Sequence, residues 1–301
     1  MQITNIIESL KKLDLSTYPK DEITSLLKQV GEICYIPVSF YRGKIVIRAR
    51  PYLDGEQRFE KKKDYSFKPQ EFNLKYQRAS TPKQTMFYAT AIPDNPQSGE
   101  LYNLRVIGAV ETIPMLRDTI TSGYQKIAFG KWEVCKDIHL LAIIQKDKYV
   151  EASRYTKELS DYYQKFIETT PHDIKERSLE FTSFLADEFS KEEIRDDYDY
   201  MISAIFSELA TQNGLDGVFY PSVRMAGKGF NISITPEATK KLRLMAAGEC
   251  SIYKKKGQTE VGNDSSVELN GTEEEFKLKD MISDRQECLD QLGVASIDDL
   301  K

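Results

Sequence analysis

The sequence is poor in the residues that usually build metal centres and disulfide frameworks. It contains only two histidines and four cysteines in 301 residues. The cysteines stand far apart, at Cys34, Cys135, Cys250 and Cys288, and no C-x-x-C pair occurs. His139 and His172 do not belong to an H-E-x-x-H motif. This pattern predicts a reducing compartment and argues against a structural zinc site, a disulfide scaffold or a histidine-ligated metal.

Long hydrophobic runs and an excess of positive charge are also missing. No apolar stretch approaches the length of a membrane-spanning helix, and Glu8 interrupts the apolar start of the chain, where a signal peptide needs a continuous core. The formal net charge is −5, so the charge balance gives no reason to expect a nucleic-acid partner. We therefore expect a cytoplasmic chain with no membrane segment and no direct contact with nucleic acid.

Several common catalytic motifs are absent as well. The chain has no G-x-x-x-x-G-K-[ST] phosphate loop, no G-x-G-x-x-G after an expected strand and no G-x-S-x-G nucleophile elbow. The remaining composition, 40% hydrophobic and 30% charged, is that of an ordinary soluble protein. Any function must therefore be found in less common patterns.

The most informative stretch is 214–236, which reads GLDGVFYPSVRMAGKGFNISITP. Its apolar run 218–220 ends at a proline, and residues 230–234 alternate apolar and polar, which is the period of a strand. The glycine-rich segment between them predicts a turn. Two short strands would thus present Ser222, Arg224 and Asn231 close together, as functional loops on rigid scaffolds often do. The alternative is a plain surface hairpin with a lysine at its tip.

A second pattern lies in the expected strand 45–50, IVIRAR. Arg48 and Arg50 are two residues apart, and side chains at that spacing point to the same face of a strand. Paired guanidinium groups in a cleft suit a diphosphate, because they bind phosphate oxygens in a bidentate way. On a solvated face they would be ordinary surface charges.

These segments, together with three others, resemble the RES-domain family, named for its Arg, Glu and Ser. The carriers of the resemblance are DGVFYPSVR at 216–224, the IRAR strand, YQRAS at 76–80, TMFYAT at 85–90 and AVE at 109–111. The resemblance covers about residues 44 to 236. RES domains are related in fold to ADP-ribosyltransferases, so it implies an α+β chain with a split β-sheet core around an NAD cleft, with flanking helices.

The resemblance also implies an activity. Family members consume NAD by glycohydrolysis, phosphorolysis or transfer of ADP-ribose, and many are toxins neutralised by a helix-turn-helix antitoxin. NAD would be the substrate, with no metal. By resemblance, Arg48 and Arg78 would hold the diphosphate and Tyr88 would stack on nicotinamide. Glu111 would hold a ribose hydroxyl and stabilise the positive charge that develops as the bond breaks. Ser222 and Asn231 would fix the ribose or the carboxamide. The alternative is a catalytically inactive RES-like module that binds a nucleotide or a partner protein.

The remaining elements are expected from periodicity. Residues 3–30 predict a helical hairpin, and helices are expected at 149–167, 174–189 and 194–211. Glu111 is expected on a strand, 106–112, with Glu133 as the nearest competing carboxylate. Residues 242–245 and 251–253 predict two edge strands, 257–275 a mobile polar segment, and 275–292 a terminal helix. We divide the chain into an N-terminal helical extension (1–43), an NAD-cleaving domain (44–256) and a polar loop with a C-terminal helix (257–301).

Overall fold

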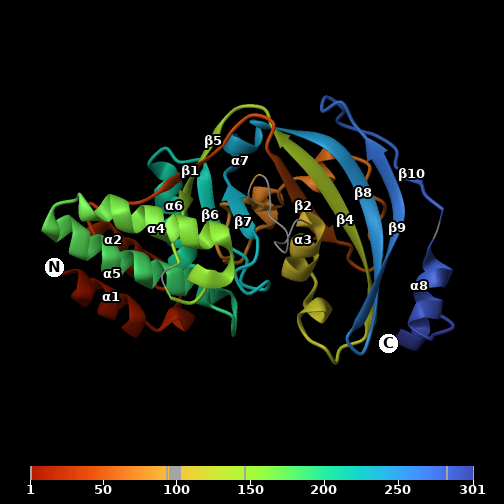
Figure 1. The fold of residues 1–301 in the computed structure, drawn as a ribbon, viewed down its shortest axis with the longest axis horizontal. Coiled ribbons are helices and arrows are strands. Elements are labelled where there is room, and N and C mark those ends of the chain that lie inside the picture. Colours follow the sequence, from red (N-terminus) through yellow and green to blue (C-terminus); the bar gives the residue numbers. More distant parts are fainter. Residues whose placement is uncertain (1, 93, 95–102, 146, 283, 301) are drawn as a thin grey trace.

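The computed structural model describes residues 2–92, 94, 103–145, 147–282 and 284–300, and it is an α+β protein (Figure 1). In this part of the chain eight helices accompany one open mixed sheet of ten strands. The strand order is β1-β5-β6-β7-β3-β2-β4-β8-β9-β10. The strands are β1 (Pro37–Phe40), β2 (Ile45–Pro51), β3 (Phe87–Ala91), β4 (Gly123–Val134), β5 (Ile138–Ala142), β6 (Gly217–Pro221), β7 (Phe230–Ile234), β8 (Leu242–Lys255), β9 (Gln258–Glu268) and β10 (Lys279–Asp280). The helices are α1 (Ile3–Lys12), α2 (Lys20–Gln29), α3 (Leu104–Thr112), α4 (Arg154–Glu168), α5 (His172–Phe189), α6 (Met201–Gln212), α7 (Pro236–Thr239) and α8 (Arg285–Gln291).

The expected N-terminal helical hairpin is confirmed as α1 and α2. Apolar residues at helical spacing, such as Ile6 and Leu10 in α1 and Ile23 in α2, are buried. They share a core with α5, α6 and strands β5 and β6. Directly after the hairpin, β1 pairs antiparallel with β5 at the edge of the sheet. The N-terminal segment is therefore built into the main body. Among the described residues, no helix is long and apolar enough to cross a membrane.

The sheet divides near its middle, between β3 and β2. These two strands share a single register pair, Ile47 with Thr90, whereas β2 follows β4 from Ile45 to Pro51. Beyond that pair the strands diverge, and the guanidinium Nη1 of Arg48 donates to the carbonyl of Tyr88 at 2.8 Å. The Arg48 side chain thus donates to a backbone carbonyl that would accept from a backbone amide of β2 in a regular ladder. We call this divergence the fork. Helices pack on the β1-β5-β6-β7-β3 half, while β4, β8 and β9 form the long curved half (Figure 1).

The C-terminal expectations were partly wrong. Residues 242–255 form one continuous strand, β8, and it lies between β4 and β9 rather than at an edge. The segment expected to be mobile contains the eleven-residue strand β9. Lys256 and Gly257, both with positive φ, make the two-residue turn that joins the two strands. The terminal helix is shorter than expected: α8 begins only at Arg285, after the two-residue strand β10.

Candidate active site

A carboxylate and two hydrogen-bond donors meet beside the fork. Oε1 of Glu111 accepts from the Ser222 hydroxyl at 2.6 Å and from Nδ2 of Asn231 at 2.9 Å. The three residues come from α3, from the end of β6 and from β7, more than a hundred positions apart in the sequence for each contact with Glu111. Among the residues that the structure describes, Oε2 of Glu111 has no hydrogen-bond partner. One carboxylate oxygen is therefore fixed by the protein while the other is available to a ligand.

The two donors are held rigidly by the β6–β7 hairpin. Ser222 is 0% exposed and its amide donates to the carbonyl of Gly229 at 3.0 Å. Gly227 donates back to the carbonyl of Ser222 at 2.8 Å. Gly227 has φ +82°, and an added Cβ would lie 2.6 Å from the Cβ of Ala152, so only glycine fits this turn. The predicted convergence of the hydroxyl and the amide is confirmed for Ser222 and Asn231, both of which donate to the same oxygen.

Glu111 lies on a helix, so the expectation of a strand at 106–112 was wrong. The Asn103 side chain accepts from the amide of Arg105 at 3.1 Å and caps the start of α3. The next residues place Ile107 and Gly108 in the interior. Gly108 allows the helix to lie directly on β2, since a Cβ there would be 2.8 Å from that of Ala49. The β-branched residues of this segment favoured a strand, but the cap and the packing decide for a helix.

Substituting Gly108 by valine is expected to push α3 away from β2 and β3. Overpacking of this kind typically costs about 1–3 kcal/mol. The free energy of unfolding, measured by urea denaturation, should fall by that amount, and the contact between Glu111 and Ser222 should loosen. Val110→Ala, a smaller change on the same helix at a half-buried position, is the matched control. An undiminished stability in Gly108→Val would show that α3 does not dock as closely as described.

Arg117 lies next to the carboxylate, and Arg224 lies within electrostatic range of Arg117. Arg117, in the turn after α3, donates to the carbonyls of Val110 at 3.1 Å and Glu111 at 2.6 Å. Burial lowers the pKa of Arg117, and the positive charge of Arg224 lowers it further, while Glu111 acts in the opposite direction. In the described part of the chain, no hydrogen bond or ion pair engages the Arg224 guanidinium. The pair therefore makes a positive region beside Glu111. Sequence reasoning did not select Arg117, whose only signal was its position at the end of the helix that carries Glu111.

Tyr88 and Arg78 lie on the helical side of this cluster. The Tyr88 hydroxyl accepts from the amide of Ala79 at 3.0 Å and forms a hydrogen bond with the Ser80 hydroxyl at 2.9 Å. Burial raises the pKa of Tyr88 to about 12. Arg78 donates to the carbonyls of Phe189 at 2.6 Å and Lys191 at 2.9 Å, at the end of α5. Arg78 is thus already used to cap a helix, as cations often do at that end.

Tyr220 connects these residues to Glu111. It is buried on β6, and its hydroxyl lies 3.3 Å from the Ser233 hydroxyl. Burial raises the pKa of Tyr220, and the neighbouring Tyr88 hydroxyl and Glu111 carboxylate act in the same direction, while Arg78 opposes them. All four groups therefore belong to one electrostatic neighbourhood. The structure brings Glu111, Ser222 and Asn231 into contact and places Tyr88 and Arg78 nearby.

Arg48 is not part of this cluster. As the alternation predicted, Arg48 and Arg50 face the same side of β2, over the rings of Phe87 at 5.3 Å and Phe59 at 4.1 Å. Their neighbour Ala49 faces α3, so the two arginines point to the opposite face of the sheet from Glu111. Burial lowers the pKa of Arg48 to about 10. The side chain bridges the fork and leaves its Nε without a partner.

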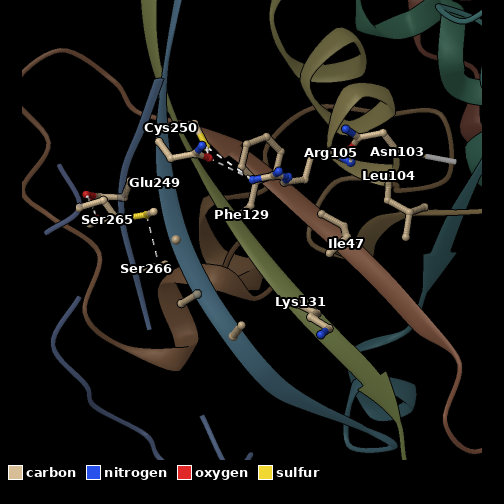
Figure 2. Close-up of a pocket in the computed structure, with 15 residues that line it drawn as sticks. Ile47, Asn103, Leu104, Arg105, Phe129, Lys131, Glu249, Cys250, Ser265 and Ser266 are labelled. Atoms are coloured by element: carbon tan, nitrogen blue, oxygen red, sulfur yellow. Dashed lines mark hydrogen bonds between the residues drawn. The ribbon is translucent and has the colours of Figure 1, made fainter. Parts of the chain in front are cut away.

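A large hollow of about 650 Å³ lies on the other side of α3, between its first turn and β8 (Figure 2). Glu111, Ser222 and Asn231 do not line it. We place the candidate site at Glu111 nevertheless, because a carboxylate held by two donors is a stronger chemical signal than the volume of a hollow. Among the described residues, no group of three or more His, Cys, Asp or Glu side chains is arranged to hold a metal ion.

Comparisons with known proteins add no assignment. No protein-family model matches the chain, and no curated protein matches it either.

Proposed function

We propose that this protein cleaves the nicotinamide–ribose bond of NAD, with Glu111 as the catalytic carboxylate. The observation that carries the proposal is the contact of Ser222 and Asn231 with one oxygen of Glu111. It unites the glutamate and serine of the RES resemblance across the fold. The free Oε2 would accept a hydrogen bond from a ribose hydroxyl of NAD.

The chemistry suits a preorganised carboxylate. When the C–N bond breaks, its electron pair leaves with nicotinamide, and the ribose carbon gains positive charge as in glycoside cleavage. A fixed anion beside that carbon stabilises the charge without reorganisation. Ser222 and Asn231 are positioning residues in this scheme, because they hold Glu111 rather than the substrate. The acceptor that then attacks the ribose carbon is water, phosphate or a protein side chain.

The arrangement of the sheet also supports the proposal. An ADP-ribosyltransferase-like core would be split into two parts around an NAD cleft, and the single register pair between β2 and β3 would mark the division in this sheet. Glu111 and Arg117 lie at the helix that crosses the fork, and Arg224 lies on the hairpin of the other half. We assign the NAD diphosphate to Arg117 and Arg224, and the nicotinamide ring to the side of Tyr88.

The direct test is to incubate the purified protein with NAD and to follow free nicotinamide by chromatography. Parallel reactions with and without inorganic phosphate separate phosphorolysis from hydrolysis, since the first yields a ribose-phosphate product and the second free ADP-ribose. Transfer to a protein would label the chain or an added protein with ADP-ribose. Saturable NAD binding without nicotinamide release would favour the inactive nucleotide-binding module, and an absence of NAD binding would exclude both.

The diphosphate assignment predicts different effects at two arginines. Arg224→Gln should raise the KM for NAD by about tenfold or more, because a bidentate guanidinium–phosphate contact is lost, while kcat changes little. Lys228→Gln, an exposed cation on the same loop, is the matched control and should leave KM unchanged. Arg48→Gln tests the assignment of the diphosphate to Arg48 that the sequence suggested. If this variant raises KM more than Arg224→Gln does, Arg48 rather than Arg224 binds the diphosphate.

A further inference from the structure

The hollow beyond α3 is a second site with a composition unlike that of the first (Figure 2). It lies over β2, β4, β8 and β9, on the part of this face that α3 leaves uncovered. Its apolar lining comes from Ile47, Leu104, Phe129, Ala246, Gly248 and Cys250. The residues of β8 that line it include Ala246, Ala247 and Gly248, whose small side chains leave space above the strand. The hollow has a volume of about 650 Å³. That volume is in the range of small-molecule sites.

Two cations, Arg105 and Lys131, line this hollow without forming an ion pair with a described acidic residue. Arg105 projects from the first turn of α3, where Nη1 contacts only neutral atoms, Asn263 Oδ1 at 3.3 Å and the Cys250 sulfur at 3.9 Å. Lys131 lines the hollow further along β4, with Phe129 and Ile47 between the two (Figure 2). In the described part of the chain neither cation forms a salt bridge.

Among the described residues that line the hollow, the one carboxylate does not neutralise these cations. Glu249 is 1% exposed, and its oxygens accept from Tyr52, Arg58, Lys126 and Ser265. The hollow therefore combines an apolar floor with two cations that have no acidic partner among the described lining residues, and one of them is a guanidinium with further N–H donors available.

We propose that this hollow binds a small amphipathic carboxylate, with its apolar body on Phe129 and Ile47 and its carboxylate on Arg105. A guanidinium fork recognises a carboxylate with two parallel hydrogen bonds. The apolar floor supplies the affinity for the body, at about 0.8 kcal/mol or nearly fourfold for each methylene buried. Because Arg105 and Glu111 lie on different sides of α3, the site is independent of the proposed NAD cleavage.

Isothermal titration calorimetry with decanoate below its micellar concentration tests the proposal. Decanoate should bind saturably with one site per chain, hexanoate at least tenfold more weakly, and decanol and decyltrimethylammonium at least tenfold more weakly as well. Equal binding of decanoate and decanol would overturn the assignment of the carboxylate to Arg105. Non-saturable uptake, or no binding of decanoate, would overturn the site.

Variants locate the ligand within the hollow. Arg105→Gln should weaken decanoate binding about tenfold or more, and Ala246→Leu, which fills the floor, should weaken decanoate and decanol alike. Lys136→Gln, an exposed cation at the β4–β5 turn, is the control and should bind as the parent does. Circular dichroism confirms the fold of each variant, and Arg105→Gln should release nicotinamide at the parental rate. Undiminished decanoate binding in both hollow variants would place the ligand elsewhere.

Discussion

Replacement of Glu111 by glutamine is expected to reduce nicotinamide release from NAD by about 10²-fold to 10³-fold, the usual cost of removing one preorganised electrostatic partner. Glutamine keeps the side-chain shape and an oxygen that can still accept from Ser222 and Asn231. What it loses is the negative charge that the proposed mechanism places beside the ribose carbon. The expected loss is therefore in kcat, with the KM for NAD and the melting temperature nearly unchanged.

The matched control is Glu133→Gln. Glu133 lies on β4 and pairs with Arg243 of β8 at 2.7 Å, remote from Ser222 and Asn231. If Glu133→Gln abolishes nicotinamide release and Glu111→Gln does not, the catalytic carboxylate has been assigned to the wrong segment. If neither change affects an active protein, the carboxylate mechanism fails.

Replacement of Glu249 by glutamine is expected to have the largest effect on stability. The side chain is 1% exposed. Its Oε2 forms ion pairs with Nε of Arg58 at 3.2 Å and with Nζ of Lys126 at 3.1 Å. Its removal leaves two cations facing a neutral amide, and breaking a buried ion pair on one side costs about 3–5 kcal/mol. We expect about 3 kcal/mol in urea denaturation, at the low end, because both cations reach solvent. Asp280→Asn is the control: Asp280 also pairs with Arg58 but is 81% exposed, so it should cost under about 1 kcal/mol.

The same network predicts how stability depends on pH. Burial alone would raise the pKa of Glu249, but hydrogen bonds from Tyr52, Ser265 and Lys126 and the nearby charge of Lys126 outweigh it and lower the pKa. Its contribution is therefore fully present above the unfolded-state pKa, about 4.3, and is lost as pH falls through the lowered folded-state value. Glu249→Gln should accordingly lose less stability than the parent on acidification below about pH 4. Parallel acid-denaturation curves for the two proteins would show that the carboxylate is not held in this way.

Local patterns predicted the part of the site that lies on one short segment. Ser222 and Asn231 flank a glycine-rich turn between two strands, so their proximity followed from the hairpin alone. The sequence also predicted that Arg48 and Arg50 lie on the same face of their strand, because side chains alternate between the two faces. Alternation does not say which face of the sheet meets which helix, and that choice separates Arg48 from Glu111. It depends on how α3 docks through Gly108, a contact between segments about sixty residues apart.

The failed expectations depend on contacts with other segments of the fold. Residues 258–268 are polar and carry little strand signal, yet they form β9 because β8 offers a long ladder on one side and β10 a short one on the other. Residues 106–112 carry β-branched side chains and form a helix because Asn103 caps them and the sheet accepts their small residues. In both cases tertiary context overrides local propensity.

The fork has a mechanical consequence for the carboxylate. Between β2 and β3 the two halves of the sheet share one ladder pair, the hydrogen bond of the Arg48 side chain and the hydrogen bond from the Thr90 hydroxyl to the carbonyl of Ile47. Helix α3, which lies on Ala49 of β2 and Thr90 of β3, connects the two halves across the fork. Glu111 lies on this helix, whereas its two donors, Ser222 and Asn231, belong to the β6–β7 hairpin in one half of the sheet. A small rotation of one half against the other would therefore change the distances from Glu111 to Ser222 and Asn231 before it broke any long ladder. The position of the Glu111 carboxylate relative to its two donors therefore depends on the angle between the two halves of the sheet.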